Sequence, residues 1–273
     1  LESRYKAHKQ CVSHLLAILR QHQVNFSCVN RVELDRQHLA DVDLVVAVGG
    51  DGTVLSSAHF LDHGTIPLLG INSDPNVKPE DIKVVHKKSD ERRSHGALCM
   101  CTALDMEDGL AQVLYGGGYL QARTRIRCKV KSTFSETRLV PALNDLLIAN
   151  PSPAAVSRFR LGWMNLNSLN VWSSGMWLST STGSTAAMAA AGGQPMPLAS
   201  EDIQYLIREH MIEGGNVDGH DLDNGMIRTE EKMHVRWNSQ KGRIFIDGSH
   251  LMHNLELGDE ILIDGRAPPL KLF

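Results

Sequence analysis

The sequence predicts a parallel α/β domain at the N-terminus, followed by a β-rich domain at the C-terminus. Helical patterns and short apolar runs alternate over the first seventy residues, which is typical of a parallel α/β sheet. After residue 118, short alternating runs separated by Gly, Asn and Asp predominate, as in all-β domains. The length of 273 residues suits one large or two modest domains. We therefore expect domains over residues 1–118 and 119–273, and leave open whether the last strands return to the first.

The N-terminal domain is expected to begin with an amphipathic helix over Ser3–Arg20, whose apolar residues recur on one helical face. The continuous apolar run Leu44–Val48 stops at two glycines, which indicates a strand buried on both faces. A helical pattern follows over Val54–Leu61, and Ile66–Ile71 predicts the next strand. A further helix is expected over Leu104–Tyr115, where three glycines end it.

The C-terminal domain is expected to consist of short strands. Their predicted ranges are Ile126–Lys131, Leu139–Asn150, Ala155–Leu161, Met176–Thr180, Met233–Trp237, Arg243–Asp247, Glu260–Asp264 and Leu270–Phe273. Within this domain no Asp, Glu, Lys or Arg occurs from Leu161 to Ser200. That segment fits either a buried domain centre or an interface with a partner subunit.

Composition excludes several classes of protein. Hydrophobic residues make up 42% and charged residues 22%, which rules out a disordered, collagen-like or coiled-coil chain. No stretch approaches the roughly 20 apolar residues of a membrane helix, so we expect no membrane partner. Lys and Arg number 28 against 31 Asp and Glu, and this balance argues against a nucleic-acid partner.

The five cysteines indicate a reducing compartment, because their number is odd and no C-x-x-C pair occurs. We therefore expect the protein to be cytoplasmic. The final residues, Lys271-Leu272-Phe273, are not a standard peroxisomal signal. A peroxisomal location stays open nonetheless, because the chain starts at Leu1 rather than Met and its ends can have been trimmed.

A glycine-rich turn, Gly49-Gly50-Asp51-Gly52-Thr53, separates the first predicted strand from its helix. Glycines let a ligand approach the backbone, and the N–H groups of a helix start attract phosphate. The turn lacks the third glycine of the dinucleotide fingerprint and the Lys of a P-loop. It carries instead an acid, Asp51, whose placement beside phosphates is favourable only if it binds a cation or takes a proton. Both are needed in phosphoryl transfer; the alternative is an ordinary strand–turn–helix corner with Asp51 as a helix cap.

Two later segments strengthen this interpretation: Leu143-Asn144-Asp145 and the run Ser179–Ala187. With the glycine turn they resemble, in the same order, the signature of the NAD kinase family. That signature is a Gly-Gly-Asp-Gly-Thr turn, an Asn-Glu/Asp pair and a Thr-Gly-Ser-Thr-Ala segment. The resemblance covers nearly the whole chain, including Asp247-Gly248 near its end, and is greatest to the plant NADH kinases. It implies a fold like that of NAD kinases and diacylglycerol kinases.

The resemblance implies ATP-dependent phosphorylation of NADH, and less efficiently of NAD, at the adenosine ribose 2′-hydroxyl. Asp51 would be the catalytic base, with Mg²⁺ bound through the phosphates and no direct protein ligand assigned. The residues facing the ATP phosphates in the first domain would be Gly49, Gly50, Gly52 and Thr53. The residues binding the dinucleotide would be Asp51, Gly52, Asn144, Asp145, Ser184, Thr185 and Ala186. A homodimer is also expected.

Three departures from the family pattern affect the dinucleotide pocket. Many members carry Tyr where this chain has Ala187, so a ring that stacks on a base must come from elsewhere or be lost. Ser73-Asp74-Pro75 replaces a Leu-Gly-Phe segment of many bacterial members. Ser173-Ser174 stands where many of them have Asp, which leads to the hypothesis that a missing negative charge favours the reduced, neutral ring.

Two alternatives compete with this function. A lipid kinase of the diacylglycerol or sphingosine type has a similar Gly-Asp-Gly turn, but Asn144 and Asp145 suit a polar diol better than a lipid. A non-catalytic sensor of dinucleotides would bind them without releasing ADP from ATP.

Overall fold

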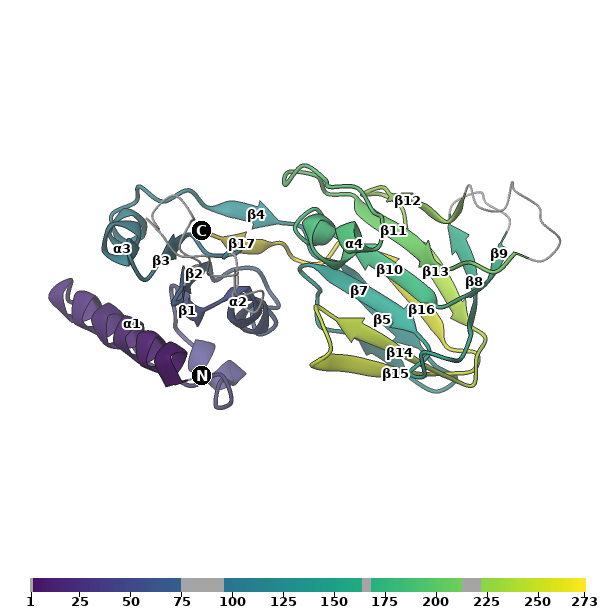
Figure 1. The fold of residues 1–273 in the computed structure, drawn as a ribbon, viewed down its shortest axis with the longest axis horizontal. Helices are drawn as coiled ribbons and strands as arrows, with labels where there is room; N and C mark the ends of the chain where they lie inside the picture. The colour runs from purple at the N-terminus through teal and green to yellow at the C-terminus, as the bar shows by residue number, and fades with distance from the viewer. Residues whose placement is uncertain (1, 75–95, 164–167, 213–221) are drawn as a thin grey trace, which may run out of the picture. The chain divides into compact units, whose positions relative to one another are not determined.

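The computed structural model describes residues 2–74, 96–163, 168–212 and 222–273. The chain divides into two compact units, Leu1–Ala122 with Leu270–Phe273, and Arg123–Pro269 (Figure 1). The division falls at Ala122, a few residues after the boundary expected at Gly118, because β4 (Gln121–Arg123) still joins the first sheet.

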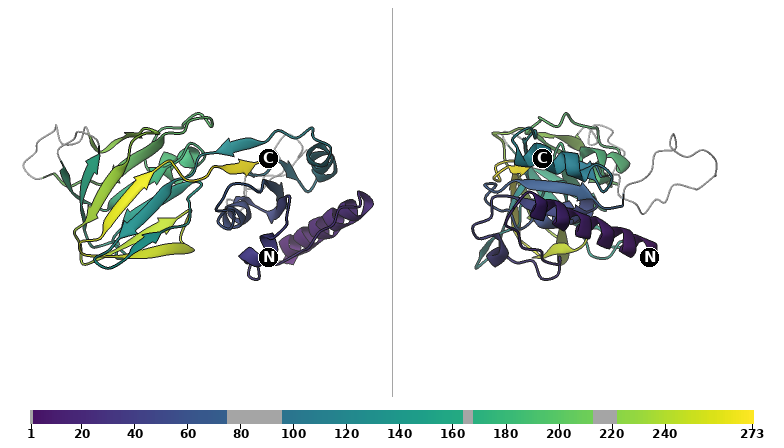
Figure 2. Two further views of the ribbon diagram at one scale, coloured as in Figure 1. Left: turned by 180° about the vertical axis from the view of Figure 1, so that it is seen from behind. Right: turned by 90° about the vertical axis from the view of Figure 1, so that its left-hand side faces the viewer.

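The first unit contains a sheet of mainly parallel strands. Its order is β1 (Val45–Gly49), β2 (Leu68–Asn72), β17 (Leu270–Leu272) and β4, and β3 (Cys101–Thr102) also pairs with β2. The pairings of β2 with β1, β3 and β17 are all parallel, which confirms the predicted α/β arrangement. The last strand therefore returns to the first sheet, where Figure 2 shows it in yellow.

The helices of the first unit are α1 (Glu2–Gln21), α2 (Asp51–Ala58) and α3 (Met106–Leu114), with a short 3-10 helix over Arg36–Leu39. The apolar face predicted for α1 packs against β2 and α3. The cluster includes Cys11, Leu15, Ile18 and Leu19 of α1, Leu69 and Ile71 of β2, and Met106 and Leu110 of α3. Each fully buried Leu or Ile stabilises this packing by about 1.5–3 kcal/mol.

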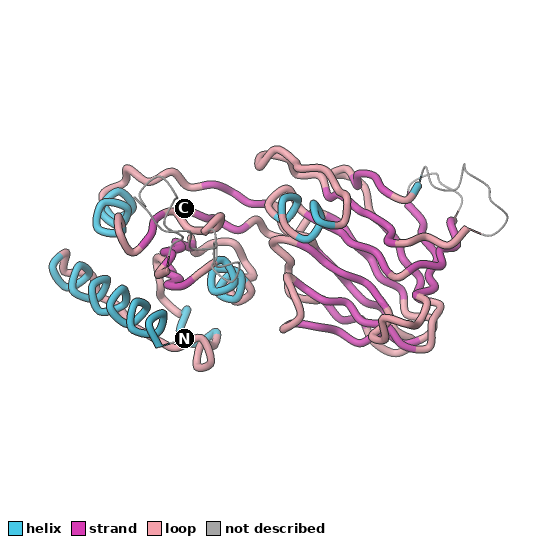
Figure 3. Tube along the Cα trace, viewed as in Figure 1, coloured by secondary structure: helices cyan, strands magenta, loops and turns pink. Residues whose placement is uncertain are grey.

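The second unit is built from two antiparallel six-stranded sheets (Figure 3). One has the order β12-β11-β10-β7-β14-β15 and the other β6-β5-β16-β13-β8-β9. The strands of the first are β7 (Asp145–Ala149), β10 (Gly175–Ser179), β11 (Ile203–Arg208), β12 (Asn224–Ile227), β14 (Lys241–Ile246) and β15 (Leu251–Glu256). Those of the second are β5 (Arg127–Lys131), β6 (Glu136–Arg138), β8 (Ser157–Trp163), β9 (Leu169–Ser173), β13 (Met233–Trp237) and β16 (Glu260–Asp264).

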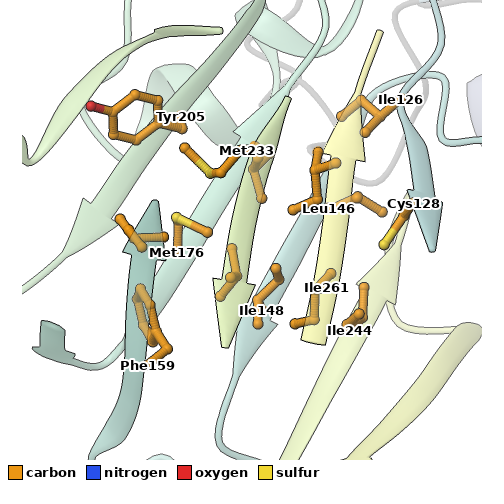
Figure 4. Packing of buried hydrophobic residues seen from close by; sticks show 14 of the residues in the cluster. Ile126, Cys128, Leu146, Ile148, Phe159, Met176, Tyr205, Met233, Ile244 and Ile261 are labelled. Carbon is orange, nitrogen blue, oxygen red and sulfur yellow. The ribbon is translucent and has the colours of Figure 1, made fainter. Parts of the chain in front are cut away.

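The core of the second unit lies between the two sheets. Inward side chains of both sheets meet there, including Leu146 and Ile148 from β7 and Met233 and Ile261 from the facing sheet (Figure 4). Part of the charge-free segment lies in this centre, since β10 lies inside its sheet and the turn after it is buried, whereas residues 189–200 are exposed or half-buried. The segment also contains a 3-10 turn (Gly183–Thr185) and the short helix α4 (Ala187–Ala190).

The strands that the sequence did not predict in this unit are β11 and the four edge strands, β6, β9, β12 and β15. An edge strand has one neighbour and exposes one side, so its apolar alternation is weak. All three residues of β6 are exposed, for example. No helix in the described ranges combines the length and the apolar composition that a bilayer crossing requires.

Candidate functional site

The glycine turn joins β1 directly to α2 in the first unit (Figure 1). The expected helix over Val54–Leu61 in fact begins at Asp51, because Gly50 is extended and serves as N-cap without a side chain. A Cβ at Gly49 would lie 2.3 Å from Thr53 Oγ1, so this position requires glycine. Gly52 is exposed, and nothing lies within 4 Å of where its Cβ would be. A phosphate can therefore approach the helix start closely, where the helix dipole favours it.

The Asp51 carboxylate is held in a fixed orientation. Its Oδ1 accepts a hydrogen bond from Leu98 N at 2.8 Å and its Oδ2 one from Ala97 N at 3.3 Å. The neighbouring Cys99 has its pKa raised to about 12, first by burial and then by the charges of Asp51 and Cys101. Asp51 is thus an oriented acid in the turn, whereas Cys99 stays a neutral thiol at physiological pH.

The Asn144-Asp145 pair lies in the second unit, on a turn that a single carboxylate holds. Asp247 accepts hydrogen bonds from three consecutive backbone N–H groups: Leu143 N at 2.9 Å, Asn144 N at 2.7 Å and Asp145 N at 3.0 Å. Asp247 N donates in return to Asp145 O at 3.0 Å. Asp247 has φ +48°, a left-handed conformation that non-glycine residues adopt at a cost.

The turn after β10 packs onto the Asn144 turn. Thr180 N donates to Asn144 O at 2.9 Å, and Thr180 Oγ1 donates to Leu143 O at 2.5 Å. A Cβ at Gly183 would lie 2.2 Å from Asn144 O, so only glycine allows the two turns to approach this closely. The second motif and the third are therefore brought together within one unit.

The third motif divides into buried and exposed parts. Ser184 is fully buried, its hydroxyl donating to Ser181 O at 2.8 Å and accepting from Met196 N at 2.9 Å. It supports the turn from inside, while Thr185 and Ala186 are exposed and form its surface.

Burial changes the chemistry of the Asn144-Asp145 pair. The pKa of Asp145 is raised to about 7, mainly by burial and further by the charge of Asp247. Near neutral pH its carboxyl group therefore both donates and accepts hydrogen bonds. The amide oxygen of Asn144 is buried and has no hydrogen-bond partner among the residues that the structure describes. A buried acceptor without a partner is costly, so this atom is suited to a ligand hydroxyl or N–H.

An open cleft of about 570 Å³ lies at the end of the third motif in the second unit, between α4 and strands β10 to β12. Ala187 and Trp177 both line it, so an aromatic surface is present beside the position where the expected Tyr is absent. The hydroxyl of Ser174 is hydrogen-bonded to the carboxylate of Glu209, another lining residue. A carboxylate therefore lies beside Ser174 although its own position carries none, and that carboxylate is 3.8 Å from Arg208 Nη2.

The segment after β2, where the sequence departs from the family pattern, contacts α1. The side chains of His8 and Ser73 are hydrogen-bonded at 3.0 Å, and Arg4 lies 3.6 Å from Asp74. Pro75 lies outside the described residues.

Three residues that the structure places at the site were given no role from the sequence: Asp247, Thr180 and Arg123. Asp247 and Thr180 each belonged to a noted motif, but nothing in the sequence showed that they hold the Asn144 turn. No pattern pointed to Arg123, which lies beside Thr182. Within the described ranges no three His, Cys, Asp or Glu side chains gather as a metal site.

Comparison with known proteins identifies the family. A model of the ATP-NAD kinase N-terminal domain matches residues 2–76. A probable NADH kinase of Oryza sativa subsp. japonica is 37% identical over 278 residues, which cover 100% of this chain and 83% of that protein. An NADH kinase of Arabidopsis thaliana is 39% identical over 279 residues, 100% of this chain and 85% of that protein. The chain belongs to the NAD kinase family. Its assignment as a dinucleotide kinase, and not a lipid kinase, is thereby confirmed.

Solved structures of NAD kinase family members share the fold. An NAD kinase from Archaeoglobus fulgidus in complex with ATP has a TM-score of 0.73 at 20% identity, covering 96% of this chain and 88% of that chain. Yeast NADH kinase complexed with NADH has a TM-score of 0.68 at 19% identity. That match covers 87% of this chain and 63% of the yeast chain, so this chain spans less than two thirds of its length.

Proposed function

We propose that the protein transfers the γ-phosphoryl group of ATP to the adenosine ribose 2′-hydroxyl of NADH, and less efficiently of NAD. The observation that carries this proposal is the Asn144-Asp145 turn. It offers a buried amide oxygen without a partner beside a carboxyl group that donates and accepts hydrogen bonds. A ribose diol, which also donates and accepts, matches this pair.

Asp51 is the proposed catalytic base. The 2′-hydroxyl loses its proton to the Asp51 carboxylate while its oxygen forms a bond to the γ-phosphorus. The bond from the γ-phosphorus to the bridging oxygen breaks, and ADP leaves with that electron pair. The two backbone N–H groups on Asp51 fix its position before the reaction, which is favourable for catalysis by orientation.

The donor phosphates are assigned to the turn of Gly49, Gly50, Gly52 and Thr53 at the start of α2. Mg²⁺ normally keeps several waters and binds substrate phosphates, so it would be held here through the donor phosphates, with no direct protein ligand assigned. When bound, Mg²⁺ supplies charge neutralisation on the transferring phosphoryl group.

The dinucleotide is assigned to the second unit, with Thr185 and Ala186 against one of its bases. The adjoining cleft offers Trp177 as a stacking surface for a planar ring. The preference for NADH is supported by the names of the two plant relatives and not by the charge near Ser174, since Glu209 is bonded there. We further propose a homodimer and a cytoplasmic location, the latter supported by five unpaired cysteines.

Steady-state kinetics with both dinucleotides test the proposal, with ADP release followed in parallel. We expect phosphorylation of both, with a higher kcat/KM for NADH. Dinucleotide binding without ADP release would instead establish a sensor. Asp51→Asn is expected to keep the fold and to lower kcat by roughly 10²–10⁴.

A matched control is Asp105→Asn, because the Asp105 carboxylate also accepts a backbone N–H, that of Thr102 at 2.6 Å, away from the glycine turn. Its kcat should stay within about twofold of wild type, as is usual for a change away from the reacting groups. More than a third of the wild-type kcat in Asp51→Asn would refute the role of Asp51 as base.

A further inference from the structure

Arg123 is a half-buried cation without a matching anion. It ends β4 and is the first residue of the second unit. Its Nη1 reaches Thr182 Oγ1 only at 3.5 Å, and its Nε is buried with no hydrogen-bond partner in the described part of the chain. Burial alone lowers the pKa of its guanidinium, and no carboxylate among residues 2–74, 96–163, 168–212 and 222–273 pairs with it.

The same unit shows how a comparable arginine is normally compensated. Arg127, four residues later in the sequence, donates to both carboxylate oxygens of Asp264, at 2.8 Å from Nε and 2.6 Å from Nη2. That hydrogen bonding raises the pKa of Arg127. A guanidinium that is partly removed from water without such a partner is destabilising, and the usual remedy is a bound anion. The missing partner of Arg123 is therefore expected to come from a ligand.

The position of Arg123 identifies the chemistry of that ligand. Thr182, its weak partner, belongs to the turn that packs on Asn144 through Thr180 and Gly183. Two buried side-chain atoms therefore lack partners among the described residues of these connected segments: a donor, Arg123 Nε, and an acceptor, Asn144 Oδ1. A ligand that satisfies both carries an anionic group for the guanidinium and a hydroxyl for the amide oxygen. A sugar bearing a phosphate has this combination.

We propose that Arg123, with the Thr182 hydroxyl, binds a phosphate group of the nucleotide held by the second unit. This inference rests on the proposed function for the identity of the nucleotide. The phosphate belongs either to the diphosphate of the dinucleotide or to the 2′-phosphate that the reaction creates. In both cases Arg123 is a positioning residue: it binds the phosphate and thereby orients the sugar attached to it. Asp51 still accepts the proton of the 2′-hydroxyl.

The test measures binding to the full chain by calorimetry with four probes: NADH, NADPH, ATP and inorganic pyrophosphate. Arg123→Met removes the charge but keeps a side chain of similar length. Arg123→Lys keeps the charge but lacks the planar guanidinium with its several N–H donors. Arg138→Met is the control, because Arg138 lies on an exposed strand. We expect Arg123→Met to weaken NADPH binding by at least about tenfold, the scale of one lost charge-assisted hydrogen bond. Arg123→Lys should lose less, and Arg138→Met less than about twofold.

The probes separate the two phosphates. An equal loss for NADH and NADPH assigns the diphosphate, and a loss confined to NADPH assigns the 2′-phosphate. The melting temperature without ligand should be unchanged or higher in Arg123→Met, because an unpaired buried charge is removed.

Two results would overturn the inference. One is an Arg123→Met variant whose affinity for all four probes is unchanged, or a wild-type protein that binds none of the four probes. The other is a lowered melting temperature with a parallel loss for every probe, which is the result of a merely structural arginine. Failure of the proposed function would be seen in a different measurement, as the absence of phosphorylation by the wild type. The two failures are distinguishable because pyrophosphate binding tests the role of Arg123 without requiring the reaction.

Discussion

The buried Asp145 should make the stability of the protein depend on pH in an unusual direction. Its pKa is raised from an ordinary 3.8 to about 7 in the folded chain, because burial and the Asp247 carboxylate disfavour its ionised form. Most carboxylates in proteins have lowered pKa values and are destabilised by acid. Asp145 should behave in the opposite way, so replacing it by Asn should remove a pH-dependent part of the unfolding free energy.

The sign and size follow from proton binding. Between about pH 4 and pH 7 the folded state holds a proton on Asp145 that the unfolded state has released, so stability falls as pH rises through this interval. Below the interval both states are protonated, and above it both are ionised. The slope reaches about 1.4 kcal/mol per pH unit in the middle of the interval, or on the order of 2 kcal/mol between about pH 5 and about pH 6.5.

Urea denaturation of wild type and Asp145→Asn at a series of pH values measures this term. Subtracting the two curves cancels the titrations that both proteins share, so the difference should fall with rising pH and level off above about pH 7. Asp247→Asn removes the charge near Asp145 but leaves Asp145 buried. The upper end of the pH range over which stability falls should therefore move to lower pH. A difference that is flat over this range, or that rises with pH, would refute the reasoning.

Two further predictions concern the close approach of the turns and the buried thiols. Gly183→Ala places a Cβ 2.2 Å from Asn144 O, so we expect a loss of about 1–3 kcal/mol in stability and a higher KM for NADH. Gly162→Ala, where nothing lies within 4 Å of the added Cβ, should change neither, and equal effects of the two substitutions would contradict the steric argument. Alkylation by iodoacetamide at about pH 8, followed by mass spectrometry, should modify the exposed Cys28 and spare Cys99 and Cys128, whose pKa values are raised to about 12 mainly by burial. Rapid labelling of Cys99 would show that its thiol is more accessible than the fold implies.

The glycine turn was readable from the sequence because its determinants are local. The apolar run before Gly49 and the requirement for glycine beside Thr53 lie within a few residues. The start of α2 was nevertheless misplaced, since Gly50 and Gly52 carry no helical pattern although Gly50 is its N-cap and Gly52 lies in its first turn. The edge strands were missed for a related reason: β6 and β15 expose most of one side, and the apolar alternation that marks a strand is produced by burial.

The sequence by itself determined the order of the motifs, the family and the residue types of the chemistry, because each motif is a short continuous string. Only the tertiary structure decided that Asp247, about a hundred residues away, holds the Asn144 turn, and that Ser184 faces inward. It also decided which buried atoms of Asn144 and Arg123 lack partners. Hydrogen-bond satisfaction and burial depend on neighbours from distant parts of the chain, and no pattern of adjacent residues encodes them.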